Sequence, residues 1–320
     1  MKIPFTIDPE RLRALRALAD HGTVTAAGRV LHLSPSAVSQ QIAALSRSTG
    51  VPLLVRHGRR VRLTPQALVL LDHARLIEAQ FERARTDLAA FDDGEVGVVT
   101  IASFGTAIRG LVAPAIGVLS QSRPRLVVTV MEVEAPECFE RLDDGAVDVA
   151  VTVDFRCGPH RNDPRYERVD LMTDPLFAVL PVRHRLARRR HVQLNALADD
   201  AWVMGTPRHP CVDISDAALA SMGVFPHTCH RVNDWDAVIA IVAQGSGVAL
   251  VPALALGPSR SEVVALPVKP WQPARGIYAA VRNGSARAPH VAAVTEALCN
   301  AAGDDLTGGM ATGVLHSRPG

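Results

Sequence analysis

The sequence predicts two unlike parts: a small helical module followed by one long helix, and then an α/β domain of two lobes. Three observations predict this class. Apolar residues recur at helical spacing across residues 1–91, in segments that Ser, Thr, Pro and Gly punctuate. Beyond this part, strand-length apolar runs alternate with helical stretches, which is the pattern of a parallel sheet covered on both faces. Hydrophobic residues make up 48% of the 320 residues, enough for sizeable cores.

Three short helices are expected at the N-terminus. Leucines three positions apart predict a helix over residues 9–18, which Gly22 ends. Thr23 or Thr25 can cap the next helix. After a turn of three residues, Ser34 followed by a proline matches the N-cap and first turn of a third helix. Two short helices joined by so tight a turn have the layout of a helix-turn-helix.

The third helix has a surface of uncharged polar groups. Its sequence, SPSAVSQQIAALSR (34–47), places apolar side chains at intervals of four and three along one face. Because Ser and Gln both donate and accept hydrogen bonds, such a helix can pair with base edges in a DNA major groove, and Gln40 suits the N6/N7 edge of adenine. In the plainer alternative, Ser36 only supports the N-cap and Gln41 is solvated. The apolar face consists of Val38, Ile42 and Leu45.

A basic hairpin is predicted next. LLVRHGRRVRLT (53–64) has two short runs on either side of His57 and Gly58, with four arginines in seven positions. Residues 1–91 hold 13 Lys and Arg against 7 Asp and Glu, whereas the rest of the chain holds 21 against 25, so the charge also favours a polyanionic partner at this end. The alternative is an exposed hairpin kept soluble by its charge. We expect base contacts from Ser36, Ser39 and Gln40, and phosphate or minor-groove contacts from Thr25, Ser34, Arg56, Arg59, Arg60 and Arg62.

A long helix is predicted from Pro65 to Phe91. Its apolar residues alternate at intervals of three and four, which is the seam of a coiled coil. This pattern favours a dimer over packing against the chain's own small N-terminal module, because about 60 preceding residues offer little surface of that length. The expected dimer contacts are Leu70, Ala74, Ile77, Phe81 and Leu88.

The second part reads as two α/β lobes. Strands are expected at 98–103, 126–133 and 147–153 in the first lobe, and at 175–181, 201–205 and 247–252 in the second. The segments 276–283 and 288–302 are expected to return to the first lobe, and 304–320 to be loose. A cleft between two such lobes, at the carboxyl ends of their strands, is a natural site for a small molecule.

Several classes of protein are not expected. No stretch supplies the roughly 20 uninterrupted apolar residues of a membrane span, and charges stand where a secretory signal needs its apolar core, so the cytoplasm is expected. Five scattered cysteines do not form a disulfide framework. There is no GxSxG, P-loop or HExxH motif, so no enzyme is expected. A metal sensor stays open as an alternative, although no metal is expected, because the spacing of His209, Cys211, His227, Cys229 and His230 fits no common zinc pattern.

The run TVTAAGRVLHLSPSAVSQQIAALSRSTGVPLLVRHGRRVRLTPQA resembles the LysR-type transcriptional regulators in its order of helix, turn, helix, wing and linker, and VAQGSGVALVP (242–252) resembles a late signature of their effector domain. The segment LSRSTG, Leu54 and Ala67 depart from the usual pattern, which leaves the subfamily undefined. The resemblance implies a cytoplasmic homodimer or homotetramer that binds double-stranded promoter DNA, contacts RNA polymerase if it activates, and carries a periplasmic-binding-protein-like effector domain. A metabolite bound between the lobes is then the effector, and no further cofactor is implied.

This resemblance also implies boundaries and effector contacts. We expect a winged helix-turn-helix at 1–64, a linker helix at 65–92, and an effector domain at 93–303. Lobe I is expected at about 97–165 and 268–303, and lobe II at about 166–267. The residues that follow strand ends in these lobes, and that we therefore expect at the effector, are Ser103, Thr106, Glu134, Thr152, Asp154, Thr206 and Asn233.

Overall fold

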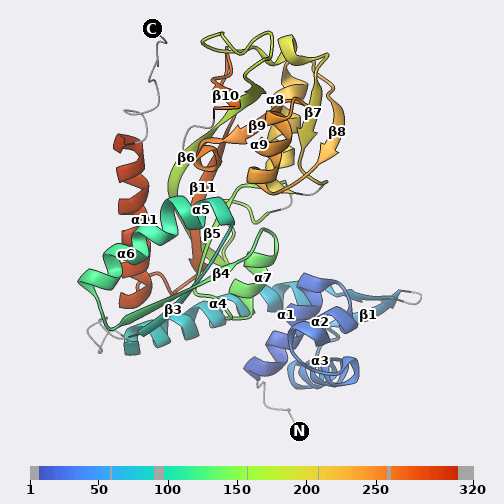
Figure 1. Cartoon of the computed structure of the whole chain (residues 1–320). Coiled ribbons are helices and arrows are strands. Elements are labelled where there is room, and N and C mark those ends of the chain that lie inside the picture. Colours follow the sequence, from blue (N-terminus) through green and yellow to red (C-terminus); the bar gives the residue numbers. More distant parts are fainter. Residues whose placement is uncertain are drawn as a thin grey trace. The chain divides into compact units, whose positions relative to one another are not determined.

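The computed structural model of the chain describes residues 7–57, 60–89, 97–156, 158–207, 209–257 and 261–308. The chain divides into two compact units. The N-terminal unit comprises Met1–Leu88 and the short segment Asn283–Ser285, and the C-terminal unit comprises Ala89–Arg282 and Ala286–Gly320 (Figure 1).

The N-terminal unit is a winged helix-turn-helix followed by a long helix. Its elements are α1 (Pro9–His21), α2 (Val24–Val30), α3 (Pro35–Thr49), β1 (Leu54–His57), β2 (Arg60–Leu63) and α4 (Pro65–Ala89). Thr23, and not Thr25, caps α2, because its Oγ1 accepts a hydrogen bond from a backbone N–H three residues on, at 3.1 Å. Ser34 caps α3 in the same way, also at 3.1 Å. The predicted order of helix, turn, helix and hairpin is confirmed.

The turn between α2 and α3 depends on a glycine. The Leu33 N–H donates to the Gly28 carbonyl at 2.8 Å. A Cβ on Gly28 would lie 2.6 Å from the Leu33 carbonyl oxygen, so any larger residue would push the two helices apart. His32 takes a positive φ of 53°, which completes the reversal. These contacts fix the direction in which α3 leaves α2.

The core of the N-terminal unit includes the first half of α4. The predicted apolar face of α3 is fully inside, with Val38 and Leu45 0% exposed and Ile42 1% exposed. Leu70 and Ala74 of α4 belong to the same core. They are 9% and 0% exposed, so they are not available to a partner chain. This corrects the expected dimer seam at these two positions: they pack inside their own unit, because the three helices before them do offer a matching apolar surface.

One sheet of seven strands runs through the C-terminal unit. Its first-lobe strands are β3 (Gly97–Ser103), β4 (Leu126–Glu132), β5 (Val149–Val153), β6 (Tyr166–Pro181) and β11 (Ala274–Arg282). β3 pairs in parallel with β4 and β5, whereas β11 is antiparallel to both β5 and β6. The expected parallel sheet is therefore mixed, because β6 carries the chain from the first lobe into the second and β11 brings it back in the opposite direction.

The lobe boundary falls inside β6. Residues up to Pro175 pair with β11, and residues from Leu176 onward pair with β9 (Ala249–Pro252) and β10 (Val263–Leu266). The boundary predicted at 165/166 is thus about ten residues too early. The boundary could not be placed from the sequence, because the first part of the strand, YERVDLMTD, is rich in polar residues and partly exposed and so lacks the apolar run of a buried strand.

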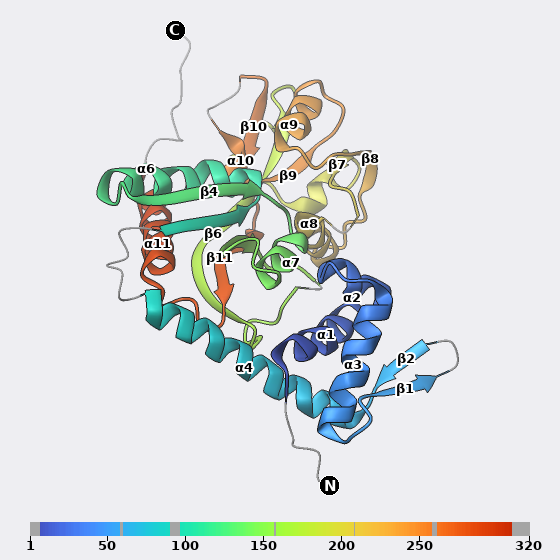
Figure 2. The same cartoon turned by 90° about the horizontal axis from the view of Figure 1, so that it is seen from below.

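Helices cover both faces of the first-lobe sheet (Figure 2). Ile101 and Val151 pack into one core with α6 (Ala113–Ser122) and α11 (Pro289–Gly308). Ala102 and Ala150, which point the other way, pack into a second core with α7 (Glu137–Asp143). The helix α11 continues to Gly308, so the loose tail expected from 304 begins no earlier than 309, and residues 309–320 lie outside the described part of the chain.

The second lobe is built around Trp202. Its remaining elements are β7 (Ala201–Met204), α8 (Pro210–Ser221), β8 (His227–Arg231), α9 (Trp235–Ala243) and α10 (Ala253–Leu256). The Trp202 ring is 0% exposed, and its Nε1–H donates to the Leu197 carbonyl at 3.1 Å. No helix among the described residues is long and apolar enough to cross a membrane.

Candidate DNA-binding and effector sites

The outer face of α3 carries the predicted base-reading residues. Ser36, Ser39 and Gln40 are exposed, on the side opposite the buried apolar stripe. The hydroxyls of Ser34 and Ser36 are hydrogen-bonded to each other at 2.9 Å, so Ser36 supports the cap as the plainer alternative expected. Ser39 and Gln40 are the side chains most open to a partner. Thr25, at the start of α2, is also exposed.

The wing places its arginines on a two-stranded hairpin. β1 and β2 are antiparallel, with Val55 opposite Arg62. Arg62 is exposed. Of the other arginines predicted to contact DNA, Arg59 and the side chains of Arg56 and Arg60 lie outside the described residues.

A buried ion pair lies at the centre of the C-terminal unit. The register of β6 and β11 places Asp174 directly opposite Arg275. The Arg275 Nε–H donates to Asp174 Oδ2 at 2.9 Å, and Nη2 lies 2.8 Å from the same oxygen. The two side chains are 2% and 0% exposed. Burial raises the pKa of Asp174, while the guanidinium and a hydrogen bond from the Leu254 N–H oppose that rise.

The same guanidinium joins both lobes. Its Nη2 donates to Thr106 Oγ1 at 2.8 Å on the first lobe, and its Nη1 contacts Cys211 Sγ at 3.4 Å on the second. Its carbon lies 4.9 Å from the centre of the Phe104 ring, which is within cation–π range. Arg275 therefore holds α5 (Gly105–Ala107), β6 and α8 together through one side chain.

Other titratable groups surround this arginine. Burial raises the pKa of the Cys211 thiol, and Arg275 opposes that rise. Burial and the charge of Arg275 both lower the pKa of His209, so its ring is neutral near pH 7. Burial among its neighbours also raises the pKa of Glu134, which keeps access to solvent, and the nearby Glu132 adds to the rise. Burial thus shifts the pKa of each of these groups toward its neutral form, and the positive charge of Arg275 opposes that shift at Cys211 and Glu134.

The predicted effector residues fall into three groups. Ser103, Thr106 and Thr152 are buried, with 0%, 5% and 2% exposure. Thr206 and Asn233 are exposed and bound to each other: Asn233 Oδ1 accepts from the Thr206 N–H at 2.8 Å and from its hydroxyl at 3.1 Å. The third group contains Glu134 near Arg275 and the exposed Asp154, which pairs with both terminal nitrogens of Arg168 at 2.5 and 3.0 Å. The roles assigned to these seven residues stay predictions.

A small pocket opens in lobe II beside Cys211. Its walls are mostly apolar, and its polar lining comes from His209, Cys211, Ser215 and Asn233. Its total volume is about 330 Å³, counting the open mouth. Ser215 is 6% exposed, so its hydroxyl is a nearly buried polar group at this wall. The described residues that line the pocket include no carboxylate, lysine or arginine.

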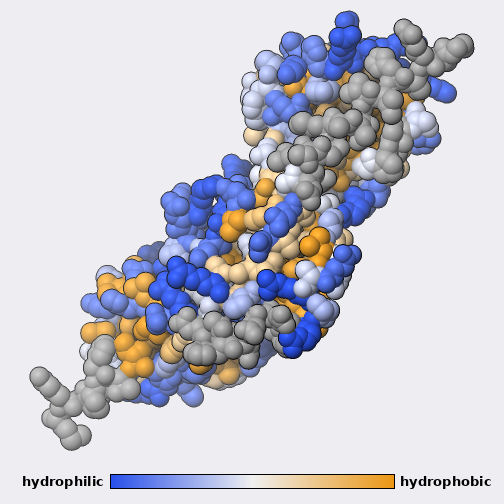
Figure 3. Space-filling view, turned by 90° about the vertical axis from the view of Figure 1, so that its left-hand side faces the viewer, coloured by the Kyte–Doolittle hydropathy of each residue, from blue (hydrophilic) through white to orange (hydrophobic). Residues whose placement is uncertain are grey.

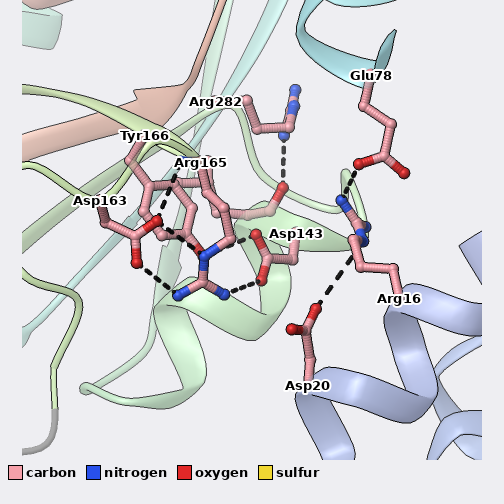
Figure 4. A network of polar contacts seen from close by, with 9 residues as sticks. Arg16, Asp20, Glu78, Asp143, Asp163, Arg165, Tyr166 and Arg282 are labelled. Atoms are coloured by element: carbon pink, nitrogen blue, oxygen red, sulfur yellow. Dashed lines mark hydrogen bonds and ion pairs between the residues drawn. The ribbon is translucent and has the colours of Figure 1, made fainter. Parts of the chain in front are cut away.

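Two further ionic clusters are structural (Figure 4). In the C-terminal unit, Arg165 pairs with Asp163 at 2.9 Å and with Asp143 at 3.4 Å, and the Tyr166 hydroxyl donates to Asp143 at 2.7 Å. Burial and the charge of Asp143 raise the pKa of Tyr166. In the N-terminal unit, Arg16 of α1 pairs with Glu78 of α4.

Apolar side chains remain exposed on both units. On α4, Leu76, Phe81 and Leu88 are 66%, 55% and 70% exposed, so the predicted positions Phe81 and Leu88 are open to a partner, whereas Ile77 packs against the core. On the C-terminal unit, Val118 of α6 and Val127 of β4 are 58% and 52% exposed. Figure 3 views the side of the molecule where α6 lies, and orange apolar patches separate its blue hydrophilic areas. These exposed apolar side chains are available for contacts with other chains.

The residues that sequence reasoning missed are Arg275 and Asp174. Cys211 and His209 entered only as possible metal ligands, and the described residues hold no cluster of three His, Cys, Asp or Glu side chains that could bind a metal. A charged residue inside the apolar run ARGIYAAVR was the available signal, because a central strand carries a buried charge only when a partner lies opposite. That partner could not be identified without the antiparallel register.

Comparisons with known proteins agree with this architecture. A LysR substrate binding domain matches residues 92–302, and a bacterial regulatory helix-turn-helix protein of the lysR family matches residues 9–68. The HTH-type transcriptional regulator TfdS of Cupriavidus pinatubonensis is 30% identical over 249 residues, which cover 76% of this chain and 81% of TfdS. A hydrogen peroxide-inducible genes activator of Escherichia coli O6:H1 is 28% identical over 276 residues, 86% of this chain and 89% of the relative.

A similar solved structure is a hydrogen-peroxide-bound, cysteine-to-serine variant of OxyR from Corynebacterium glutamicum. It has a TM-score of 0.62 at 21% identity and covers 98% of both chains. The matched models define a class: bacterial regulators with an N-terminal helix-turn-helix and a substrate-binding domain. This chain belongs to the LysR family of DNA-binding transcriptional regulators, and it carries the effector-binding domain of that family.

Proposed function

We propose that this regulator reads its operator with Ser39 and Gln40 of α3, and holds the phosphate backbone with Arg62 and Thr25. The observation that carries this proposal is the outer face of α3, where uncharged donors and acceptors lie exposed while the apolar stripe is buried. A Gln amide can form two hydrogen bonds to adenine, so it distinguishes one base from another. An arginine contact to a phosphate does not distinguish the bases. In this proposal α3 determines which DNA sequence is preferred, and the wing contributes affinity for any sequence.

Two substitutions separate these roles. Gln40→Ala should cost roughly 1 to 3 kcal/mol at one base position and little elsewhere, because it removes a base contact. Arg62→Ala should weaken binding to every sequence alike and reduce its salt dependence, because it removes a phosphate contact. Fluorescence anisotropy with a set of single-base operator variants measures both effects. If Gln40→Ala weakens all variants equally, α3 does not read bases through this side chain.

We also propose that a small-molecule effector acts at the junction of the two lobes, around Arg275. This proposal is supported by the contacts of one guanidinium with Thr106 on lobe I and Cys211 on lobe II. A ligand that alters either contact changes how the lobes are held together. In this role the chain works in the cytoplasm as a dimer or tetramer that binds double-stranded promoter DNA, meets RNA polymerase if it activates, and has no catalytic activity of its own.

A peroxide is a second candidate effector. It is supported by the relative that is a hydrogen peroxide-inducible genes activator and by the position of Cys211, whose thiol lines a small uncharged pocket beside a guanidinium. In the reaction, the thiolate attacks one peroxide oxygen, the S–O bond forms and the O–O bond breaks. The hydroxide that leaves takes up the proton that the thiol released and departs as water. Sulfur is oxidised to the sulfenic acid, and the peroxide is reduced.

The two effector proposals have separable tests. Treating the purified protein with one equivalent of hydrogen peroxide and then with a sulfenic-acid-trapping dione should label Cys211, as peptide mass spectrometry measures. Cys211→Ser should abolish that label, whereas Cys299→Ser, a change at a partly exposed thiol on α11, should leave it unchanged. No label at Cys211 would reject the peroxide and leave a non-covalent effector at the lobe junction.

A further inference from the structure

The turn between β11 and α11 packs closely against the linker helix α4. Its residues Asn283–Ser285 belong to the N-terminal unit, although the elements on either side of it belong to the C-terminal unit. The Thr86 hydroxyl of α4 donates to the Gly284 carbonyl at 3.0 Å. Thr86 is 6% exposed and Ser285 is 4% exposed, so the turn excludes water from this side of α4.

Only a glycine permits this approach. Gly284 has a φ of 96°, which side chains rarely adopt, and a Cβ there would lie 2.5 Å from the carbonyl oxygen of Ala79 on α4. The same Cβ would be 3.0 Å from Arg83 Cγ. Because the nearest atom belongs to the helix backbone, no rotamer change can relieve the contact. The backbone of the turn therefore lies directly on the backbone of the linker helix.

The turn is also fixed from the other side. Arg282, the last residue of β11, donates through Nη1 to the carbonyls of Leu142 and Val147 at 2.8 and 2.6 Å. Its Nη2 lies 3.2 Å from Asp148. At the other end of β11, Arg275 holds the lobe junction. A strand of nine residues spans roughly 30 Å at about 3.3 Å per residue. Between the two arginines its pairing with β6 shifts register once, after Ile277, while its pairing with β5 is continuous from Ile277 to Val281.

We propose that Asn283–Ser285 is a coupling clamp, through which β11 transmits the state of the lobe junction to the linker helix α4. The clamp makes the local stability of α4 around Ala79–Thr86 depend on the contacts of Arg275. The clamp extends the proposed function, since it explains how an effector bound at the lobe junction changes the DNA-binding unit. The mechanical coupling itself does not depend on the proposed function, but its role in regulation rests on it.

Amide hydrogen exchange of the full-length protein, followed by mass spectrometry over residues 76–89, tests the clamp. Gly284→Ala should speed exchange there by between about twofold and tenfold, the effect of losing roughly one hydrogen bond. Gly145→Ala is the matched control, because Gly145 also has a positive φ, of 77°, but no atom within 4 Å of its Cβ position. Thr86→Val should behave like Gly284→Ala, and Thr86→Ser, which keeps the hydroxyl, like the wild type.

A double-variant cycle tests transmission and not mere packing. Thr106→Val removes one hydrogen bond of Arg275 at the lobe junction and should speed exchange at residues 76–89 in the wild-type background. In the Gly284→Ala background it should have no further effect on these residues. Equal effects in both backgrounds, or none in either, would overturn the clamp. DNA binding by the wild type is measured separately, so failure of the regulatory function and failure of the clamp give different results.

Discussion

Replacing Arg275 by methionine should destabilise the C-terminal unit strongly. The change keeps much of the side-chain volume but leaves the Asp174 carboxylate, which is 0% exposed, without its cation. Breaking a buried pair by removing one partner costs about 3–5 kcal/mol. The loss of the hydrogen bond to Thr106 falls within the same estimate, since the guanidinium makes both contacts. For a domain of this size, each kcal/mol lowers the Tm by about 2–4 °C, so we expect a drop of about 10 °C.

Differential scanning calorimetry of the full-length protein measures this change. Arg161→Met is the control, because Arg161 is 63% exposed and its pair with Asp170 lies at the surface. An exposed pair contributes at most about 1 kcal/mol, so the control should melt within about 3 °C of the wild type. A Tm of Arg275→Met equal to that of the control would refute the reasoning that the buried pair holds the lobes together.

The pH dependence of the same variant gives an independent check. Burial already raises the pKa of Asp174, and the charge of Arg275 is the main force that opposes the rise. Without Arg275 the folded-state pKa moves further above the unfolded value, so the folded state binds more protons than the unfolded state between the two. The free energy of unfolding should therefore fall as pH rises through that interval. A variant whose stability rises with pH across the same interval would contradict this assignment.

Three other perturbations have clear expected results. Ser34→Ala removes the N-cap of α3 and should cost about 1 kcal/mol in the free energy of unfolding of the N-terminal unit, whereas Ser39→Ala on the exposed face should cost little, as urea denaturation will show. Phe81→Glu should give monomers in sedimentation velocity, because this exposed apolar ring is a predicted dimer contact; unchanged dimers would reject that role. Oxidation of Cys211 by peroxide should accelerate as pH rises above 7, since burial raises the thiol pKa and only the thiolate reacts; a rate that is flat with pH would indicate a thiolate already formed.

The sequence predicted well where local signals were strong. Ser34 and Pro35 predicted where α3 begins, and the structure has this helix from Pro35 to Thr49. The apolar stripe of α3 was visible because helical periodicity repeats over only three or four residues. Such features depend on neighbours along the chain, and they are recovered from one sequence.

Features that depend on register and packing were not recovered. The half of α4 that enters its own core and the half that stays exposed carry the same three-four pattern, so Leu70 and Phe81 could not be told apart. β6 was missed in its first half because its polar residues alternate with partly buried ones. The pairing of Arg275 with Asp174 follows from strand register across about one hundred residues, which no local pattern encodes.

The most direct test of the central claim is the binding of the full-length protein to the DNA upstream of its own gene. Fluorescence anisotropy at about 0.1 M salt compares that fragment with a scrambled one of equal composition, for the wild type and for Gln40→Ala. We predict that the wild type prefers its own fragment by at least about 10³-fold and that Gln40→Ala reduces this preference. Equal affinity of the wild type for both fragments, or no binding to either, would contradict a regulator that reads duplex DNA through α3.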